Sequence, residues 1–197
     1  MTEINTVSLN DTSLLQINKN EALRYLGIKK EDEITSALLL ECEREIRKIS
    51  TPKAVYLKTP IMINGDDIDF GFMKVKSVNL AKNLSGCKEA YIFAATLGIG
   101  LDRHFQRLFA VSQSKATVFS ALGSALVESF CDYVNEEIVK GKEAKPRFSC
   151  GYGDFCLEHQ REILSILQAS KRLGICLTDS CMMVPVKSVT AVIGIRR

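Results

Sequence analysis

The chain has 197 residues, of which 46% are hydrophobic, so it is large and apolar enough for one substantial core, which excludes a fibrous or disordered protein. The formal net charge is only +3, and basic and acidic residues are interspersed, which argues against the concentrated basic face of a nucleic-acid-binding protein. No apolar run is long enough for a membrane span, and the N-terminus lacks the features of a signal peptide. We expect one cytoplasmic domain over residues 1–197, with residues 1–30 as an N-terminal arm and short helix.

The cysteines and histidines do not form a recognisable metal site or disulfide framework. There are seven cysteines, an odd number, and no Cys-x-x-Cys pair. The spacings of Cys150 to Cys156 and of Cys176 to Cys181 are not those of a zinc or iron–sulfur site. We expect no metal, and we interpret most of the cysteines as small buried hydrophobic residues.

The first fifty residues predict an extended arm followed by two helices. Residues 1–18 alternate apolar and polar side chains, which suits an arm or an edge strand. Asn20 resembles the N-cap of a short helix that ends at Gly27. Residues 31–50 have apolar side chains at intervals of three and four, which predicts an amphipathic helix ended by Pro52. The apolar residues of this helix are Ile34, Leu38, Cys42, Ile46 and Ile49.

The next segment predicts short strands and a helix. Residues 54–58 and 61–63 suit two strands on either side of Pro60, and the Asn-Gly-Asp-Asp sequence at 64–67 suits a turn into residues 68–72. Helical spacing follows in Val75, Val78, Leu80 and Leu84, and the helix is expected to end at Gly86.

Residues 89–97 are apolar almost throughout, which predicts a strand that is buried on both faces. The strand leads through Gly98-Ile99-Gly100 into a helix. This order is similar to a dinucleotide-binding fingerprint, but the third glycine is absent and Arg103 stands nearby. A plain strand-to-helix turn is therefore the preferred interpretation.

Residues 114–140 form the longest helical pattern of the chain. Its apolar residues recur every four positions: Val118, Leu122, Leu126, Phe130, Val134 and Ile138. A second face has small residues, Ala121, Ser124 and Ala125, and then Glu128. Small side chains allow a ligand or another backbone to approach closely, with Glu128 at the edge of that space. Taken alone, Glu128 is better interpreted as a solvated helix carboxylate.

The C-terminal part predicts a helix at 157–173, ended by Gly174, and then short strands. The β-branched residues at 189–195 support a final strand, and Pro185 suits a strand edge or bend. The whole pattern predicts an α+β fold with long helices packed on a mixed or antiparallel sheet.

The most chemically varied segment is residues 147–159. Arg147 offers a planar fork for a carboxylate or a phosphate, and Gly151 and Gly153 on either side of Tyr152 allow unusual backbone conformations. The segment alone is equally consistent with a binding loop and with a tight turn into the next helix.

Four blocks in this order carry a family resemblance: Glu128-Ser129-Phe130-Cys131-Asp132-Tyr133, Arg147-x-x-x-Gly151-Tyr152, Cys156-Leu157-Glu158-His159, and the segment from Leu177-Thr178-Asp179-Ser180-Cys181-Met182-Met183 to Ser188-Val189. Together they resemble the activation domain of cobalamin-dependent methionine synthase. The N-terminal half matches only loosely, so its residues are given no role by this resemblance.

The resemblance implies a protein that binds S-adenosylmethionine and takes part in the reductive methylation of an oxidised cobalamin. Arg147 would engage the methionine carboxylate and Glu128 the amino group, while Gly151, Tyr152 and Gly153 would form the loop against the ligand. A guanidinium fork suits a carboxylate, and a glutamate suits an ammonium. Such a site positions its ligand, so no catalytic acid or base is expected.

The same resemblance implies the partners. The cobalamin fingerprint Asp-x-His-x-x-Gly does not occur in the chain. We therefore expect action in trans on a corrinoid protein, namely a methionine synthase without its own activation domain, with flavodoxin or a similar one-electron donor. Cys150 and Cys156 stand where the family pattern favours proline.

Two other functions remain open at this point. One is a docking module for a corrinoid protein that performs no chemistry. The other is an S-adenosylmethionine-dependent methyltransferase with a different acceptor, although its usual glycine-rich signature is poor here. His104 and His159 are interpreted as structural or surface residues.

Overall fold

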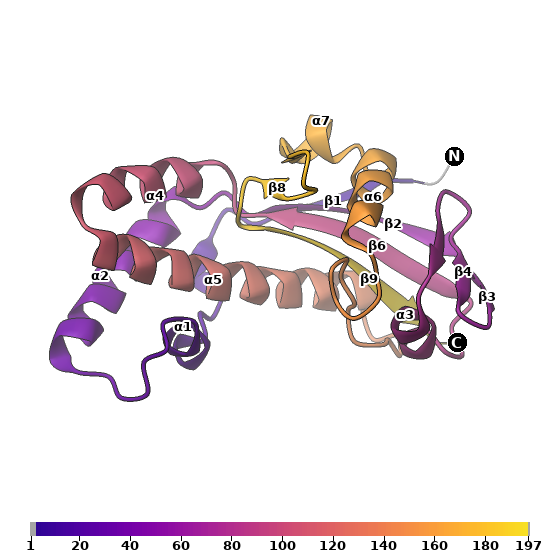
Figure 1. The fold of residues 1–197 in the computed structure, drawn as a ribbon, viewed down its shortest axis with the longest axis horizontal. Coiled ribbons are helices and arrows are strands. Elements are labelled where there is room, and N and C mark those ends of the chain that lie inside the picture. The colour runs from indigo at the N-terminus through magenta and orange to yellow at the C-terminus, as the bar shows by residue number, and fades with distance from the viewer. Residues whose placement is uncertain (1–2, 197) are drawn as a thin grey trace.

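The centre of the fold is a four-stranded sheet in the order β1-β2-β6-β9, seen in a computed structural model that describes residues 3–196 (Figure 1). The strands are β1 (Asn5–Ser8), β2 (Lys53–Pro60), β6 (Glu89–Thr96) and β9 (Ser188–Ile195). Every neighbouring pair is antiparallel, and Phe93 of β6 is paired with Tyr56 on one side and with Ala191 on the other. The predicted α+β class and antiparallel sheet are confirmed.

The sheet separates two hydrophobic cores. Ala54, Phe93 and Ala191 face the core on the side of the long helices, and Val55, Ile92 and Val192 face the core on the opposite side. All residues of β6 after Glu89 are buried, because this central strand is covered on both faces. The prediction of a strand buried on both faces is confirmed.

The long helices cover one face of the sheet and continue beyond its end (Figure 1). They are α1 (Lys19–Tyr25), α2 (Glu33–Ile49), α4 (Gly100–Val111) and α5 (Gln113–Val139), with the short 3-10 helix η1 (Thr12–Leu14) before them. The six apolar residues predicted to line one stripe of α5 are all buried. Helix α5 packs against α1, α2 and α4, so it is the principal support of this layer.

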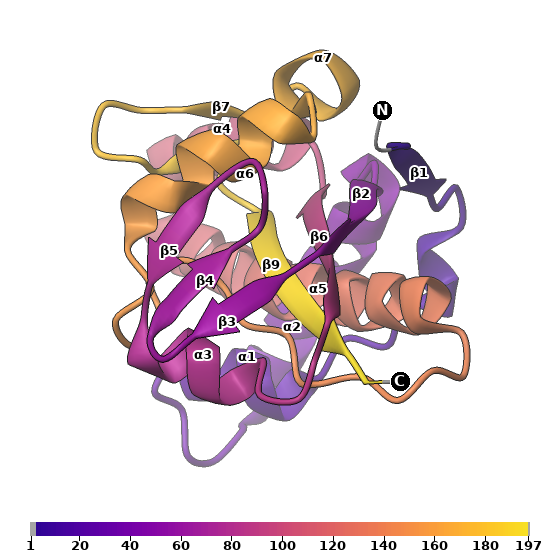
Figure 2. The same ribbon diagram turned by 90° about the vertical axis from the view of Figure 1, so that its right-hand side faces the viewer.

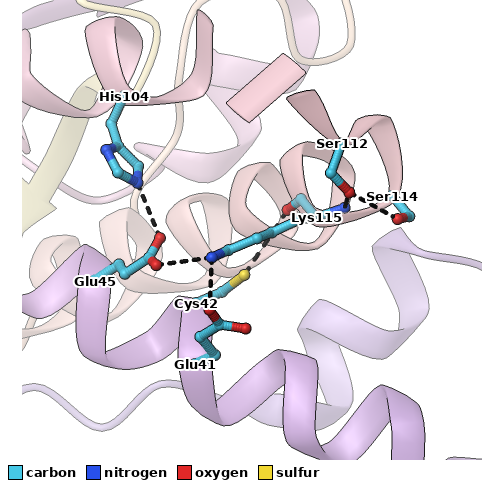
Figure 3. Close-up of polar contacts among 7 residues, drawn as sticks. All are labelled: Glu41, Cys42, Glu45, His104, Ser112, Ser114 and Lys115. Atoms are coloured by element: carbon cyan, nitrogen blue, oxygen red, sulfur yellow. Dashed lines mark hydrogen bonds and ion pairs between the residues drawn. The ribbon is translucent and has the colours of Figure 1, made fainter. Parts of the chain in front are cut away.

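A polar cluster joins three of these helices (Figure 3). Lys115 of α5 donates from Nζ to Glu41 Oε1 at 2.7 Å and to Glu45 Oε1 at 2.8 Å, both on α2. His104 of α4 places Nε2 2.9 Å from the other oxygen of Glu45. The Glu41 and Glu45 carboxylates raise the pKa of Lys115 above its ordinary value. His104 therefore lies in an interhelical network, in agreement with the structural role predicted for it.

The opposite face is covered by a small sheet and three short helices (Figure 2). These elements are β3 (Met62–Asn64), β4 (Asp67–Asp69), β5 (Lys74–Lys76), α3 (Val78–Asn83), α6 (Gln160–Ile166) and α7 (Ala169–Leu173), with the 3-10 helix η2 (Leu157–His159). A two-stranded hairpin of β7 (Cys176–Leu177) and β8 (Met183–Val184) precedes β9. Pro185 lies in the bend between β8 and β9, as predicted.

Several predicted boundaries are wrong in the N-terminal half. The cap of α1 is Asn18, whose side chain accepts a hydrogen bond from Glu21 N, and not Asn20. The apolar face of α2 is also placed differently. Ile34, which was expected on that face, is 80% exposed, and Leu39 is the residue of the first half of α2 that faces the core. Strand β2 continues through Pro60, whose missing N–H the ladder tolerates at a strand end.

Two predicted helices are also divided differently. Val75 belongs to β5, because Ser77 caps α3 by accepting a hydrogen bond from Leu80 N and so starts the helix after it. The helix expected over 157–173 is interrupted at Gln168, which has a φ of +52°. This turn lets Leu167 and Ala169 both enter the second core.

All seven cysteines are free thiols, and five of them are buried: Cys42, Cys87, Cys131, Cys150 and Cys181. The interpretation of most cysteines as buried small residues is confirmed. Among the described residues, no helix is both long enough and apolar enough to cross a membrane.

Candidate functional site

The C-terminal half of α5 presents three polar residues on one face. Glu128, Asp132 and Asn135 are separated by four and three positions, which places them in a row along the helix. Another side of α5 has a buried apolar stripe that includes Phe130 and Val134. This stripe packs in the first core and so fixes the orientation of the helix and of its polar row.

A connecting segment after α5 completes the site. Residues 144–148 run antiparallel beside β9, where Phe148 exchanges two backbone hydrogen bonds of 2.9 Å with Val192. Lys145 N adds a bond of 2.8 Å to Gly194 O. This pairing extends the sheet edge and holds Arg147 opposite the polar face of α5.

Together these elements enclose a pocket of about 450 Å³, within the usual range for small-molecule sites. Its lining residues are Glu128, Asn135, Pro146, Arg147, Phe148, Ser149, Tyr152 and Val189. Of the five residues predicted for the site, the structure thus brings Glu128, Arg147 and Tyr152 to one pocket. Gly151 and Gly153 lie in the adjoining turn and do not line it.

Arg147 forms a fork between two carboxylates. Its Nη2 donates to Glu128 Oε2 at 2.7 Å, and its Nη1 donates to Asp132 Oδ1. Burial by itself would lower the pKa of Arg147, but the bonds to Asp132 and Glu128 outweigh it and raise the pKa. The two carboxylates and one guanidinium leave the group with a net charge of −1.

The partners of Arg147 differ in their exposure to water. The Arg147 side chain is 23% exposed and that of Glu128 is 33% exposed, whereas that of Asp132 is 67% exposed. Because water screens the pair with Asp132 more strongly, the pair with Glu128 is the more significant one.

The two glycines serve the turn between the pocket and α6. Gly151 has a φ of +88°, and its N–H donates to Phe155 O at 2.7 Å while Phe155 N–H donates back to Tyr152 O at 3.0 Å. A Cβ on Gly153 would come within 2.8 Å of Asn79 Nδ2. The tight-turn interpretation of this segment is confirmed, and ligand contact by the two glycines stays a prediction.

Two aromatic rings stand at the turn. Tyr152 is 65% exposed, and its ring centroid lies 6.5 Å from that of Phe148 at an interplanar angle of 62°.

Cys150 lies buried in the second core, and burial raises the pKa of its thiol to about 12. Cys150 is consequently a packed thiol and not a nucleophile.

Asp154 anchors the turn to α3. Its carboxylate accepts hydrogen bonds from Ser77 Oγ, from Val78 N at 2.8 Å and from Asn79 N at 3.1 Å. These bonds, that of Ser77 foremost, lower the pKa of Asp154 to about 2 from its ordinary value of 3.8. The turn that carries Tyr152 is therefore fastened to a separate part of the chain.

Asp154→Asn is expected to lower the thermal unfolding midpoint at pH 7. A carboxylate with a lowered pKa stabilises the folded state above its ordinary pKa, and the stabilisation is lost as the pH falls towards 2. The difference between wild type and variant should therefore shrink between pH 4 and pH 2. The exposed Asp67→Asn is the control, and a difference that does not depend on pH would contradict the assignment.

Sequence reasoning gave no role to Asp132, Asn135 or Asp154. The helical spacing from Glu128 was a usable signal for the first two, because positions four and seven residues later share one face. No local signal marks Asp154, because its partner Ser77 lies 77 residues away.

A larger hollow of about 620 Å³ lies between the small sheet and α3, but none of the five predicted residues lines it. Within residues 3–196, no three histidine, cysteine or acidic side chains are grouped as a metal would require. Among the hollows formed by residues 3–196, we take the pocket beside α5 as the candidate site because three of the predicted residues line it, including a half-buried guanidinium that pairs with two carboxylates.

Comparison with known proteins adds two findings. Residues 79–196 match the model of the family described as vitamin B12 dependent methionine synthase, activation domain. The fold is similar to a crystal structure of the MetH reactivation domain bound to AdoHcy, with a TM-score of 0.71 and 17% identity over 98% of this chain and 78% of that chain. No curated protein matches the chain. The matched family region contains the whole pocket, and the structural likeness, at this identity, shows the fold.

Proposed function

The chain belongs to the family of vitamin B12 dependent methionine synthase activation domains, and from this premise we propose that its pocket binds S-adenosylmethionine for the reductive methylation of a cobalamin. The similar MetH reactivation domain is bound to AdoHcy, the demethylated form of the same molecule. A common ligand for the two proteins would account for a pocket at the residues that carry the family resemblance.

The observation that carries this proposal is the charge of the ion-pair group at the pocket, in which Arg147 and Glu128 are lining residues and Asp132 pairs with Arg147 from outside the lining. Arg147, Glu128 and Asp132 sum to −1. S-adenosylmethionine has a sulfonium, an ammonium and a carboxylate, so its net charge is +1. The site and the ligand therefore complement each other in total charge and in the kinds of groups they carry.

In the proposed complex, the ligand separates Arg147 from Glu128, which form an ion pair in the free protein. The methionine carboxylate takes the fork of Arg147, and the ammonium takes Glu128, so Arg147 and Glu128 each exchange one partner for another. Asp132, whose side chain is 67% exposed, gives up its bond to Arg147 and is solvated by water. The exchange explains why two residues that bind opposite ends of an amino acid contact each other in the free protein.

The chemistry asked of this chain is positioning. When the methyl group transfers, its bond to sulfur breaks and a bond to the reduced cobalt of the partner forms, while sulfur keeps the electron pair and leaves as a neutral thioether. The sulfonium is already an activated leaving group, so no side chain needs to move a proton. Before the transfer, one electron must reach the oxidised cobalamin from an external one-electron donor.

The proposal includes partners. The cobalamin would be held by a corrinoid protein, a methionine synthase that lacks its own activation domain, and flavodoxin or a similar protein would supply the electron. The absence of the Asp-x-His-x-x-Gly fingerprint from the sequence supports a corrin carried by the partner.

A reactivation assay tests this function. The cognate synthase is loaded with cob(II)alamin and a reductant, and its absorption spectrum is followed after this chain and S-adenosylmethionine are added. Formation of methylcobalamin only when both are present is the expected result. If the spectrum never changes, the proposal is wrong. Complex formation without any methyl transfer would instead indicate a docking module.

Glu128→Gln is expected to weaken S-adenosylmethionine binding about tenfold, equivalent to ~1.4 kcal/mol. The loss for AdoHcy should be smaller, because the Glu128 carboxylate attracts both the ammonium and the sulfonium of S-adenosylmethionine, and AdoHcy lacks the sulfonium. Calorimetric titration of both ligands measures the ratio. Glu137→Gln, on the opposite face of α5, is the matched control. Equal losses for the two ligands would contradict the charge argument.

A further inference from the structure

One side chain of the pocket has an unsatisfied polar atom. The carboxamide oxygen of Asn135 is buried and accepts no hydrogen bond within residues 3–196. Asn83 and Gln160 have oxygens in the same condition, but Asn135 is the one that lines the candidate site. Because folded proteins pair nearly all their buried polar atoms, such an oxygen on a residue that lines a pocket points to a donor that arrives with a ligand and meets the oxygen once the amide turns.

The position of Asn135 tells which part of the ligand it meets. Asn135 follows Glu128 by seven residues, so it lies on the same face of α5 and about 10 Å further along the helix axis. In the proposed complex, Glu128 holds the amino-acid end of S-adenosylmethionine. An elongated ligand that starts at Glu128 and follows the pocket along α5 brings its nucleoside half to Asn135.

The pocket that Asn135 lines has surfaces that suit a nucleoside. Phe148 and Tyr152 line the same pocket and supply aromatic surface, and Val189 adds an apolar side chain from β9. Of the charged lining residues, Glu128 lies seven residues before Asn135 on α5, and Arg147 pairs with Glu128 and with Asp132 between them. An uncharged amide in a pocket that also has aromatic rings is typical of a site that reads a neutral, flat ring by hydrogen bonding.

We propose that Asn135 is a specificity residue for the nucleoside half of the ligand, a role that rests on the proposed function. Its carboxamide oxygen accepts a hydrogen bond from either the exocyclic amino group of adenine or the 2′-hydroxyl of the ribose. Rotation about χ2 exchanges the oxygen and the nitrogen of the amide, and this torsion is soft, so the oxygen turns towards a donor that enters the pocket.

The test is calorimetric titration of wild type and Asn135→Leu with three ligands: AdoHcy, its inosine analogue, which replaces the amino group by an oxygen, and its 2′-deoxy analogue, which lacks a hydroxyl. Wild type should bind AdoHcy about tenfold more tightly than one of the two analogues. Asn135→Leu should remove that difference by weakening AdoHcy alone. Sensitivity to the inosine analogue assigns the amino group, and sensitivity to the deoxy analogue assigns the hydroxyl.

Two further variants keep the result interpretable. Asn135→Asp retains an acceptor oxygen and should keep the discrimination, even if Asn135→Leu fails to fold. Gln160→Leu removes a buried carboxamide of the same kind away from the pocket, and it should leave the ratio of affinities unchanged. The inference is overturned if wild type binds all three ligands equally, or if Asn135→Leu weakens all three to the same extent. If wild type binds neither S-adenosylmethionine nor AdoHcy, the proposed function fails as well.

Discussion

Arg147→Ala is expected to weaken S-adenosylmethionine binding by ~1.5–3 kcal/mol, which is the usual range for a hydrogen bond to a charged group. The substitution removes the fork that would receive the ligand carboxylate. It also leaves Glu128 and Asp132 without the cation that holds them in place. Both effects act at the amino-acid end of the ligand. Calorimetric titration of the ligand into wild type and variant measures the loss.

Two companion variants separate the causes of this loss. Arg147→Lys keeps the positive charge but removes the planar fork, so it should restore only part of the affinity. Arg172→Ala removes an exposed arginine in α7 and should bind like wild type. If Arg147→Ala binds as tightly as wild type, the carboxylate is held elsewhere and the assignment of Arg147 is wrong.

Phe130→Ala is expected to lower the free energy of unfolding by ~3–5 kcal/mol, the usual cost of removing a buried phenylalanine. Phe130 is fully buried in the first core, and its ring stacks with that of Tyr133 at a centroid distance of 6.4 Å. Because α5 carries Glu128 and Asp132 on either side of Phe130 in sequence, the same substitution should also loosen the pocket.

Urea denaturation measures the stability loss from Phe130→Ala, with Phe109→Ala as the matched control. Phe109 lies on α4 and is 50% exposed, so its truncation should cost far less. A similar cost for the two variants would show that the packing of α5 is not what supports the site.

The parts of the fold that the sequence predicted are those with strong local patterns. The four-residue spacing of α5 and the unbroken apolar run of β6 each determine an element without reference to the rest of the chain. The boundaries that failed depend on contacts elsewhere. Ser77 starts α3 late, and the turn at Gln168 divides a helix because residues on both sides of it pack into one core.

The candidate site divides in the same way. Glu128, Arg147 and Tyr152 were predicted from a family resemblance, and the structure places them around one pocket. The pairing of Arg147 with Glu128 could not be predicted, because it depends on how residues 144–148 run beside β9. The unsatisfied oxygen of Asn135 and the anchoring of Asp154 to α3 likewise result from tertiary packing alone.

The most direct measurement is a crystal structure of this chain with S-adenosylmethionine. We expect ligand density between α5 and residues 146–152, with the carboxylate on Arg147 and the ammonium on Glu128. The nucleoside should lie at the end of the pocket nearer Asn135. Density for the ligand at another place on the surface, with the ion pair of Arg147 and Glu128 intact, would contradict binding of S-adenosylmethionine at this pocket.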